Sequence, residues 1–162
     1  MLVYRYVKEK YLNDPLSAEG AAKVGGRWNS EGTLMLYASK SASTAQLEIL
    51  AGVNEYATLQ RFRLVCIEIP DDIFYLTPVM LEGAQQEMGS ELSWNADIRP
   101  DFTVIIGESW FAEQSTLAIG VPSSLSSNDY SILINTEHKD FDKVKIHTID
   151  NERISQRLVI TD

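Results

Sequence analysis

The order of the patterned segments is the feature that most constrains the fold of this 162-residue chain. Segments rich in β-forming residues are interspersed with segments of helical periodicity, but the two kinds do not alternate as in a parallel βαβ fold. The sequence therefore predicts a single α+β domain over residues 1–162. Strands are expected at residues 2–8, 34–39, 61–69, 73–76, 117–121, 131–134 and 143–149, and helices at 42–53, 80–88 and 100–114.

The segment between the first two predicted strands, residues 12–32, has the period of neither regular structure and is rich in glycine and small residues. It is expected to be a long loop. Long loops in compact domains are often functional, because a rigid scaffold can position binding residues on them. Functional residues are therefore sought first in this segment.

Composition narrows the class of protein. The chain carries 23 acidic and 14 basic residues, a formal charge of -9, which disfavours direct binding to nucleic acid. No apolar run reaches the 18 residues of a membrane span, and the first ten residues do not form a secretory signal. Cys66 has no disulfide partner, and with only His138 and His147 beside it a Cys/His zinc set is impossible. We expect a cytoplasmic protein without a metal.

The string GGRWN at residues 25–29 closes the long loop. Two glycines allow a close approach of the backbone to a ligand, Arg27 offers a planar cation suited to phosphate or carboxylate oxygens, and Trp28 offers a face for stacking. A tight turn with a partly buried tryptophan explains the string equally well. No phosphate-binding P-loop or dinucleotide fingerprint occurs in the chain.

Two further side chains are candidates to join Arg27. Tyr37 belongs to the predicted strand at 34–39, and Glu48 lies on the flank of the apolar stripe of the next helix, which begins with a capping box at Ser43 and Gln46. The strand-to-helix turn brings both toward one end of the sheet. Taken singly, Tyr37 fits core packing and Glu48 fits a solvated helix flank, so only the combination predicts a site.

Two polar residues, Ser123 and Asn135, follow or end predicted strands. No nucleophile elbow surrounds the serine, and neither histidine has an acidic partner in the sequence, so a nucleophilic triad is not supported. These side chains are expected to bind a ligand. The alternative for each is a turn residue that satisfies the local backbone.

Taken in order, five of these positions resemble the RES-domain toxins, a family named for its Arg, Glu and Ser. The resemblance extends from Arg5 to Arg157 and includes the GESW segment at residues 107–110. It implies a fold like that of ADP-ribosyltransferases, with mixed and antiparallel sheets flanked by helices, and NAD as the substrate. It also implies a toxin whose active site is covered by a helix-turn-helix, Xre-like antitoxin. The five matches are Arg27 in GGRWN, Tyr37 in LYAS, Glu48 in AQLEIL, Ser123 in VPSS and Asn135 in LIN.

The resemblance implies roles for these residues. Cleavage of the nicotinamide–ribose bond, as in an NAD glycohydrolase, is the leading expectation. It requires an ionised Glu48, which the ordinary pKa of glutamate permits at neutral pH and which a nearby arginine would favour further. The alternatives are mono-ADP-ribosylation of a cellular protein and a catalytically silent module that only binds its antitoxin or a regulator. The expected catalytic residues are Arg27, Tyr37 and Glu48, and the expected NAD-binding residues are Arg27, Trp28, Tyr37, Ser123 and Asn135.

Overall fold

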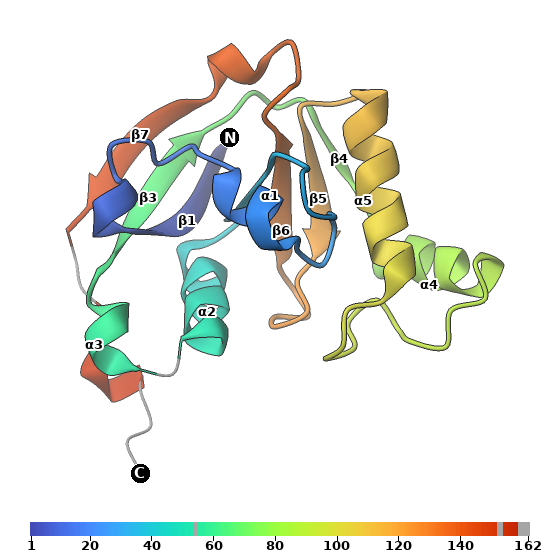
Figure 1. Ribbon diagram of the computed structural model, residues 1–162, viewed down its shortest axis with the longest axis horizontal. Helices are drawn as coiled ribbons and strands as arrows, with labels where there is room; N and C mark the ends of the chain where they lie inside the picture. The colour runs from blue at the N-terminus through green and yellow to red at the C-terminus, as the bar shows by residue number, and fades with distance from the viewer. Residues whose placement is uncertain (54, 152–153, 159–162) are drawn as a thin grey trace.

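A computed structural model describes residues 1–53, 55–151 and 154–158. Its strands form one seven-stranded sheet in the order β4-β5-β6-β2-β1-β3-β7, with helices packed around it (Figure 1). The pair β4–β5 is parallel and the other neighbouring pairs are antiparallel, so the predicted α+β class is confirmed. The strands are β1 (Leu2–Lys8), β2 (Met35–Ser39), β3 (Phe62–Glu68), β4 (Ile73–Tyr75), β5 (Ala118–Pro122), β6 (Tyr130–Asn135) and β7 (Lys145–Asp150).

All three predicted helices are present, each end lying within two residues of the predicted one, and the short helices at 19–24 and 56–59 were not predicted. The loop predicted at 12–32 contains a short helix, and the capping box predicted at Ser43 does not form. Instead the Ser41 hydroxyl accepts the Thr44 N–H, because Ser41 has the extended backbone of an N-cap. The helices are α1 (Glu19–Val24), α2 (Ala42–Gly52), α3 (Tyr56–Leu59), α4 (Pro78–Glu87) and α5 (Asp101–Glu113), with 3₁₀ turns at Glu9–Tyr11, Phe141–Lys143 and Gln156–Leu158.

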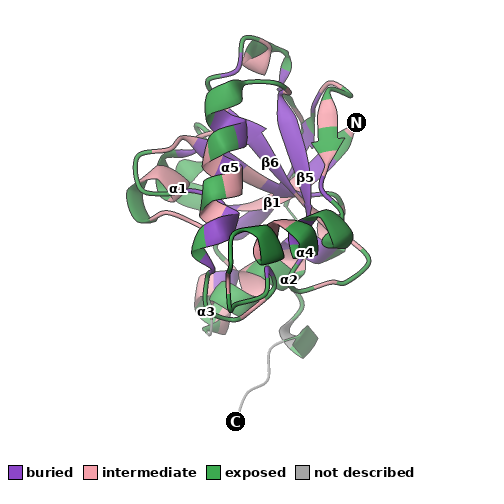
Figure 2. Cartoon of the chain, turned by 90° about the vertical axis from the view of Figure 1, so that its right-hand side faces the viewer, coloured by how far each residue is buried: buried purple, intermediate pink, exposed green. Residues whose placement is uncertain are grey.

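The centre of the sheet is apolar on both faces. Because successive side chains of a strand point to opposite faces, Met35 packs with α4 and α5 while Leu36 packs on the other side, toward β1 and β3. Figure 2 shows the buried strands β5 and β6 behind α5. Within the part of the chain that the structure describes, no helix is both long and apolar enough to cross a membrane.

The junction between β1 and β2 differs from the other ladders of the sheet. β1 pairs with β3 along its whole length, but its pairing with β2 is confined to Tyr4 and Ser39. Beyond that pair the two strands diverge, and α2 packs against both of them. The divergence leaves space inside the sheet where other neighbouring strands are closed by hydrogen bonds, and it positions the site described next.

Candidate active site

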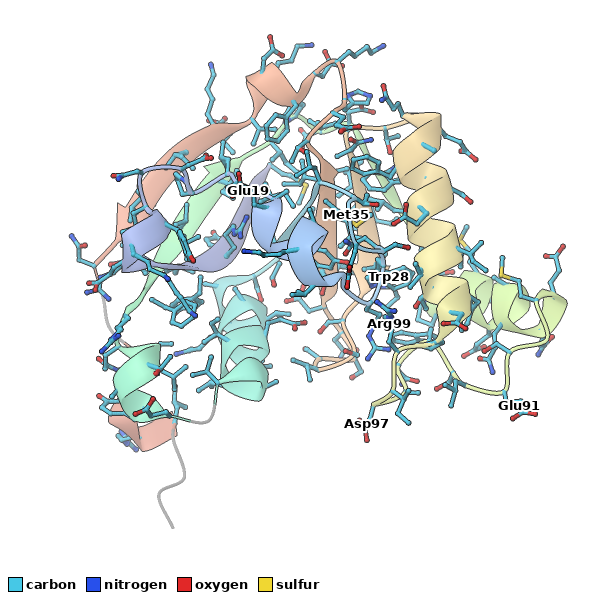
Figure 3. All side chains as sticks on the ribbon, viewed as in Figure 1. Glu19, Trp28, Met35, Glu91, Asp97 and Arg99 are labelled. Carbon is cyan, nitrogen blue, oxygen red and sulfur yellow. The ribbon has the colours of Figure 1, made fainter. Side chains whose placement is uncertain are left out.

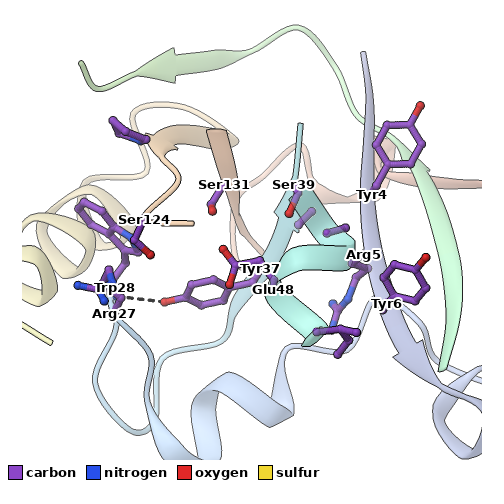
Figure 4. Close-up of a pocket in the computed structure, with 14 residues that line it drawn as sticks. Tyr4, Arg5, Tyr6, Arg27, Trp28, Tyr37, Ser39, Glu48, Ser124 and Ser131 are labelled. Atoms are coloured by element: carbon purple, nitrogen blue, oxygen red, sulfur yellow. Dashed lines mark hydrogen bonds between the residues drawn. The ribbon is translucent and has the colours of Figure 1, made fainter. Parts of the chain in front are cut away.

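A cavity of about 340 Å³ opens where β1 and β2 diverge (Figure 4). Four of the residues predicted from the sequence, Arg27, Trp28, Tyr37 and Glu48, line it together. In the close-up, Arg27 and Arg5 lie on opposite sides of Tyr37 and Glu48. The remaining lining residues are Tyr4, Tyr6, Ala38, Ser39, Ala45, Ile49, Pro122, Ser124 and Ser131.

The Arg27 guanidinium is held by backbone carbonyls. Nη1 donates to the Trp94 carbonyl at 2.9 Å and Nη2 to the Ala96 carbonyl at 2.8 Å. Among the described residues, no carboxylate lies within ion-pair distance of it. Partial burial lowers the pKa of Arg27, and the charge of Glu48 opposes that shift. The cation is therefore fixed in place while its charge is left for a ligand anion.

The turn that carries Arg27 is tightly packed. A Cβ atom on Gly26 would lie 2.6 Å from the Tyr37 hydroxyl, so the backbone approaches that ring more closely than a side chain allows. The Gly26 carbonyl accepts from Arg99 at 3.1 Å, and the Arg27 carbonyl accepts from the Thr103 hydroxyl at 2.7 Å. Figure 3 shows Arg99 and Trp28 at the same end of α5.

The GESW segment acts on this turn from α5. A Cβ atom on Gly107 would lie 1.9 Å from the Trp28 carbonyl, so the glycine lets the helix lie directly on the turn. The Glu108 carboxylate accepts from the Ser30 N–H at 2.7 Å and from the Thr33 hydroxyl at 2.8 Å. This segment therefore positions the loop and does not line the cavity. Trp28 itself is 3% exposed and forms part of the cavity wall.

Tyr37 presents its ring to the cavity and uses its hydroxyl elsewhere. The hydroxyl accepts the Trp28 N–H at 3.1 Å and donates to the Asn29 side chain at 2.8 Å. Burial raises the pKa of Tyr37 well above its ordinary value, so the phenol remains neutral. Since both hydrogen bonds of the hydroxyl are engaged, Tyr37 contributes a wall and a fixed ring to the site, with no proton to exchange.

Glu48 extends from α2 to the cavity, and the Ser131 hydroxyl hydrogen-bonds its carboxylate. Although Glu48 is an exposed residue as a whole, partial loss of water around the carboxyl group raises its pKa. Arg27 and Ser131 each lower the pKa, but by less than desolvation raises it. Arg27 therefore favours the charged form of Glu48, as expected, but the loss of water, which the sequence does not indicate, outweighs it and the net pKa is raised.

Sequence reasoning assigned no role to Arg5, which lines the cavity from β1. Its guanidinium is largely buried, and desolvation lowers its pKa to about 10. Its Nη1 atom donates to the Ser17 carbonyl at a long distance of 3.4 Å. A charged residue in the middle of an otherwise β-forming segment is the signal that would have found it. The Trp94 and Ala96 carbonyls, by contrast, have no sequence signal.

Ser123 and Asn135 lie outside the residues that line the cavity, so the structure does not bring them to the predicted site. The Ser123 hydroxyl accepts the N–H groups of Leu125 and Ser126, each at 3.2 Å. Asn135 donates to the Phe111 carbonyl at 2.8 Å and accepts from Glu137 at 2.9 Å. Each side chain satisfies nearby backbone, as the alternative held. Ser124 and Ser131 are the serines at the cavity.

One group of potential metal ligands occurs among the described residues, and it is separate from the cavity. Ligand atoms of Asp72, His138 and Asp140 lie within 4.8 Å of one another. Each already has a partner: Asp72 accepts the Leu117 N–H, His138 accepts the Asp140 N–H, and Asp140 pairs with Lys143 at 2.6 Å. These contacts explain the cluster as part of the fold.

Comparison with known proteins shows the family to which this chain belongs. A family model described as "RES domain" matches residues 2–157. The chain is 35% identical over 141 residues to "Toxin Res" of Yersinia enterocolitica, covering 87% of this chain and 88% of that protein. It is 29% identical over 149 residues to the "Prs ADP-ribosylating toxin" of a Sphingobium species, covering 92% and 89% of the two chains.

A solved structure supports the fold independently. The crystal structure of the Mycobacterium tuberculosis MbcT-MbcA toxin-antitoxin complex contains a chain that superposes with a TM-score of 0.71 at 20% identity. The match covers 97% of this chain and 85% of that chain. At this level of identity the likeness shows a shared fold and carries no residue-level conclusion.

Proposed function

We propose that this chain, which belongs to the RES domain family, is the toxin of a toxin–antitoxin pair and cleaves NAD at the bond between nicotinamide and ribose. The observation that carries the proposal is the convergence of the Arg27 guanidinium and the Glu48 carboxylate on one cavity, on either side of the Tyr37 ring. Two relatives, one named as a toxin and the other as an ADP-ribosylating toxin, support the same class of chemistry.

The reaction explains why a carboxylate belongs there. As the glycosidic bond breaks, its electron pair leaves with nicotinamide and the ribose carbon develops oxocarbenium character. An ionised Glu48 stabilises that positive charge more than it stabilises the ground state, which lowers the barrier. Water then adds to the ribose carbon and loses a proton, which gives ADP-ribose. Arg27 binds a phosphate or ribose oxygen of the nicotinamide half, and Tyr37 and Trp28 form the wall against which that half packs.

Glu48→Gln tests the catalytic role. Loss of one preorganised electrostatic group costs on the order of 10²–10³ in rate, so nicotinamide release from NAD should fall by about that factor. Glu113→Gln, an exposed carboxylate on α5 outside the cavity, is the matched control and should retain full activity. Equal turnover by the Glu48 variant and the wild type would contradict the proposal, and no turnover by the wild type would leave only the silent binding module.

The second candidate function, mono-ADP-ribosylation of a cellular protein, rests on the name of the Sphingobium relative. Both reactions break the same bond and differ in what attacks the ribose carbon. NAD labelled in the adenosine moiety separates them in a cell extract. Free labelled ADP-ribose supports hydrolysis, whereas label that stays on a protein band after denaturation supports transfer.

We propose a helix-turn-helix antitoxin as the partner that covers the cavity. The similar fold in the MbcT-MbcA toxin-antitoxin complex and the charge of -9, which suits a basic DNA-binding partner, support this partner. Titration of the purified partner into the chain should abolish nicotinamide release at one equivalent. Residual full activity in the saturated complex would show that the partner binds elsewhere.

A further inference from the structure

A second cavity, of about 470 Å³, adjoins the one described above. It lies between β1, the 3₁₀ turn Glu9–Tyr11 and α1, and it shares two lining residues, Arg5 and Tyr6, with the first cavity. A ligand that extends from one cavity into the other must therefore pass these two side chains. The first cavity alone is near the lower end of the usual range for small-molecule sites, roughly 300–1,000 Å³, which is small for a dinucleotide.

Arg5 is suited to hold an anion at this passage. Among the described residues, no carboxylate comes within ion-pair distance of it, and its hydrogen bond to the Ser17 carbonyl is long. Burial disfavours its charged form, and a cation of this kind gains most from an anionic ligand. The pyrophosphate is the anionic centre of NAD and joins its two halves. Arg5 lies where that centre would be if each cavity held one half.

The second cavity also differs from the rest of the molecule in charge. Its lining carries four basic and two acidic side chains, although the whole chain has 14 basic and 23 acidic residues. Lys8, Lys10 and Lys23 are among the basic ones. A local excess of cations in an acidic protein favours a phosphorylated ligand over a neutral one.

An aromatic side chain completes this lining. Tyr11 is 55% exposed, and the Lys10 ammonium lies 4.6 Å from its ring centroid. An exposed ring beside ammonium groups offers a stacking surface to a purine base, and such stacking contributes about 1–3 kcal/mol per base in nucleic-acid complexes. Tyr11 belongs to neither hydrophobic cluster of the core, and it lines this cavity.

From this arrangement we infer that the second cavity binds the adenosine monophosphate half of NAD, with Arg5 at the pyrophosphate and Tyr11 against the adenine. The inference rests on the proposed function, because it extends the same substrate beyond the catalytic cavity. It makes NAD a ligand of both cavities and nicotinamide mononucleotide a ligand of the first alone.

Calorimetric titration with the two halves tests the inference. AMP and nicotinamide mononucleotide should bind the same molecule at the same time, each without displacing the other. Tyr11→Ala should weaken AMP binding and raise the KM for NAD by about tenfold, and should leave the binding of nicotinamide mononucleotide unchanged. Phe74→Ala, which removes a ring of similar exposure on β4, is the matched control and should change neither.

The outcomes separate this inference from the proposed function. Mutual displacement of AMP and nicotinamide mononucleotide, or equal AMP and NAD affinity in Tyr11→Ala and the wild type, overturns the second subsite while NAD cleavage stands. Failure of the wild type to release nicotinamide from NAD overturns the proposed function and this inference with it. A second pair of variants compares AMP affinity independently. Lys23→Ala should weaken AMP binding and Lys145→Ala should not, since only the first lysine lines the cavity.

Discussion

The two arginines that line the first cavity are held in different ways. Arg27 donates to two carbonyls, at 2.8 and 2.9 Å, whereas Arg5 donates to one carbonyl at 3.4 Å. On folding, the Arg27 guanidinium exchanges water for hydrogen bonds to two carbonyls. The Arg5 guanidinium also loses water but gains only one long hydrogen bond. The difference indicates that Arg27 is a preformed element of the site, while the position of Arg5 is completed by the ligand.

Charge-conserving substitution should reveal this difference most strongly. A lysine ammonium cannot donate in two fixed, coplanar directions, so Arg27→Lys loses the geometry that the Trp94 and Ala96 carbonyls impose. We expect kcat/KM for NAD to fall on the order of 10². Arg5→Lys should cost about tenfold less, because no bidentate geometry is lost there. Equal losses in steady-state assays of the two variants would remove the distinction.

The support behind Arg27 can be weakened without touching the cation. Thr103 is fully buried, and its hydroxyl lies 2.7 Å from the Arg27 carbonyl and 2.8 Å from the Pro100 carbonyl. Thr103→Val removes this donor from the Arg27 carbonyl, which should cost about 1–3 kcal/mol of unfolding free energy and lower kcat/KM about tenfold. Urea unfolding and NAD kinetics measure the two effects. Thr148→Val, on the exposed strand β7, is the control that should change neither.

The titration of Glu48 distinguishes the arginines in a third way. Arg27 lowers the pKa of Glu48, and Arg5 is not among the groups that shift it. Removing the charge in Arg27→Gln should therefore raise this pKa further, and Arg5→Gln should leave it unchanged. Carbon-detected NMR of the Glu48 carboxyl reads the shift directly. A larger shift in the Arg5 variant would reverse our assignment of the nearer cation.

Each arginine also has a more distant carboxylate, Asp97 for Arg27 and Asp14 for Arg5. Such partly solvated interactions are weak, so Asp97→Asn and Asp14→Asn should each change kcat/KM by less than about fivefold. The effects should shrink as the salt concentration rises. A salt-independent loss in either variant would point to a direct contact with the substrate.

The smallest effect concerns stability. Because the folded-state pKa of Glu48 is raised, its protonated form is favoured by folding, and the stability that this supplies at acidic pH is lost as the pH rises through the folded pKa. Glu48→Gln should therefore raise the Tm slightly at pH 7 and not at pH 4. Thermal unfolding of both proteins at the two pH values measures the difference. A lower Tm of the variant at pH 7 would show that its contacts with Arg27 and Ser131 outweigh desolvation.

Much of the fold followed from local pattern. The strands and the three longer helices could be predicted because their apolar residues repeat with the period of each structure. The helix α1 could not, since residues 19–24 contain no buried side chain to create such a period. The cap at Ser41 was missed because Ser43, with Gln46 three residues later, matches the capping-box pattern, whereas Ser41 is followed by Thr44.

The site was predictable where the side chain itself carries the chemistry. Arg27, Tyr37 and Glu48 have distinctive side chains in unusual local strings, and the structure places all three on one cavity. Ser123 carries the same hydroxyl as Ser124 and Ser131, and sequence alone does not tell which of these serines will bond to the local backbone and which will line the cavity. Arg27 donates to the backbone carbonyls of Trp94 and Ala96. The side chains of these residues take no part in the contact, so the sequence gives no sign of it.

The single pair that joins β1 to β2, Tyr4 with Ser39, has a mechanical consequence. A single residue pair gives little resistance to sliding of β1 along β2. The half of the sheet that ends in β2 and the half that begins with β1 therefore depend on side-chain packing and on α2 to keep their spacing. A dinucleotide bound across this junction, as we propose, would hold the two halves together by adding contacts to both where the backbone supplies almost none. The junction between β1 and β2 should therefore become more rigid as NAD binds. Protection of β1 and β2 amides from hydrogen exchange should increase with the NAD concentration.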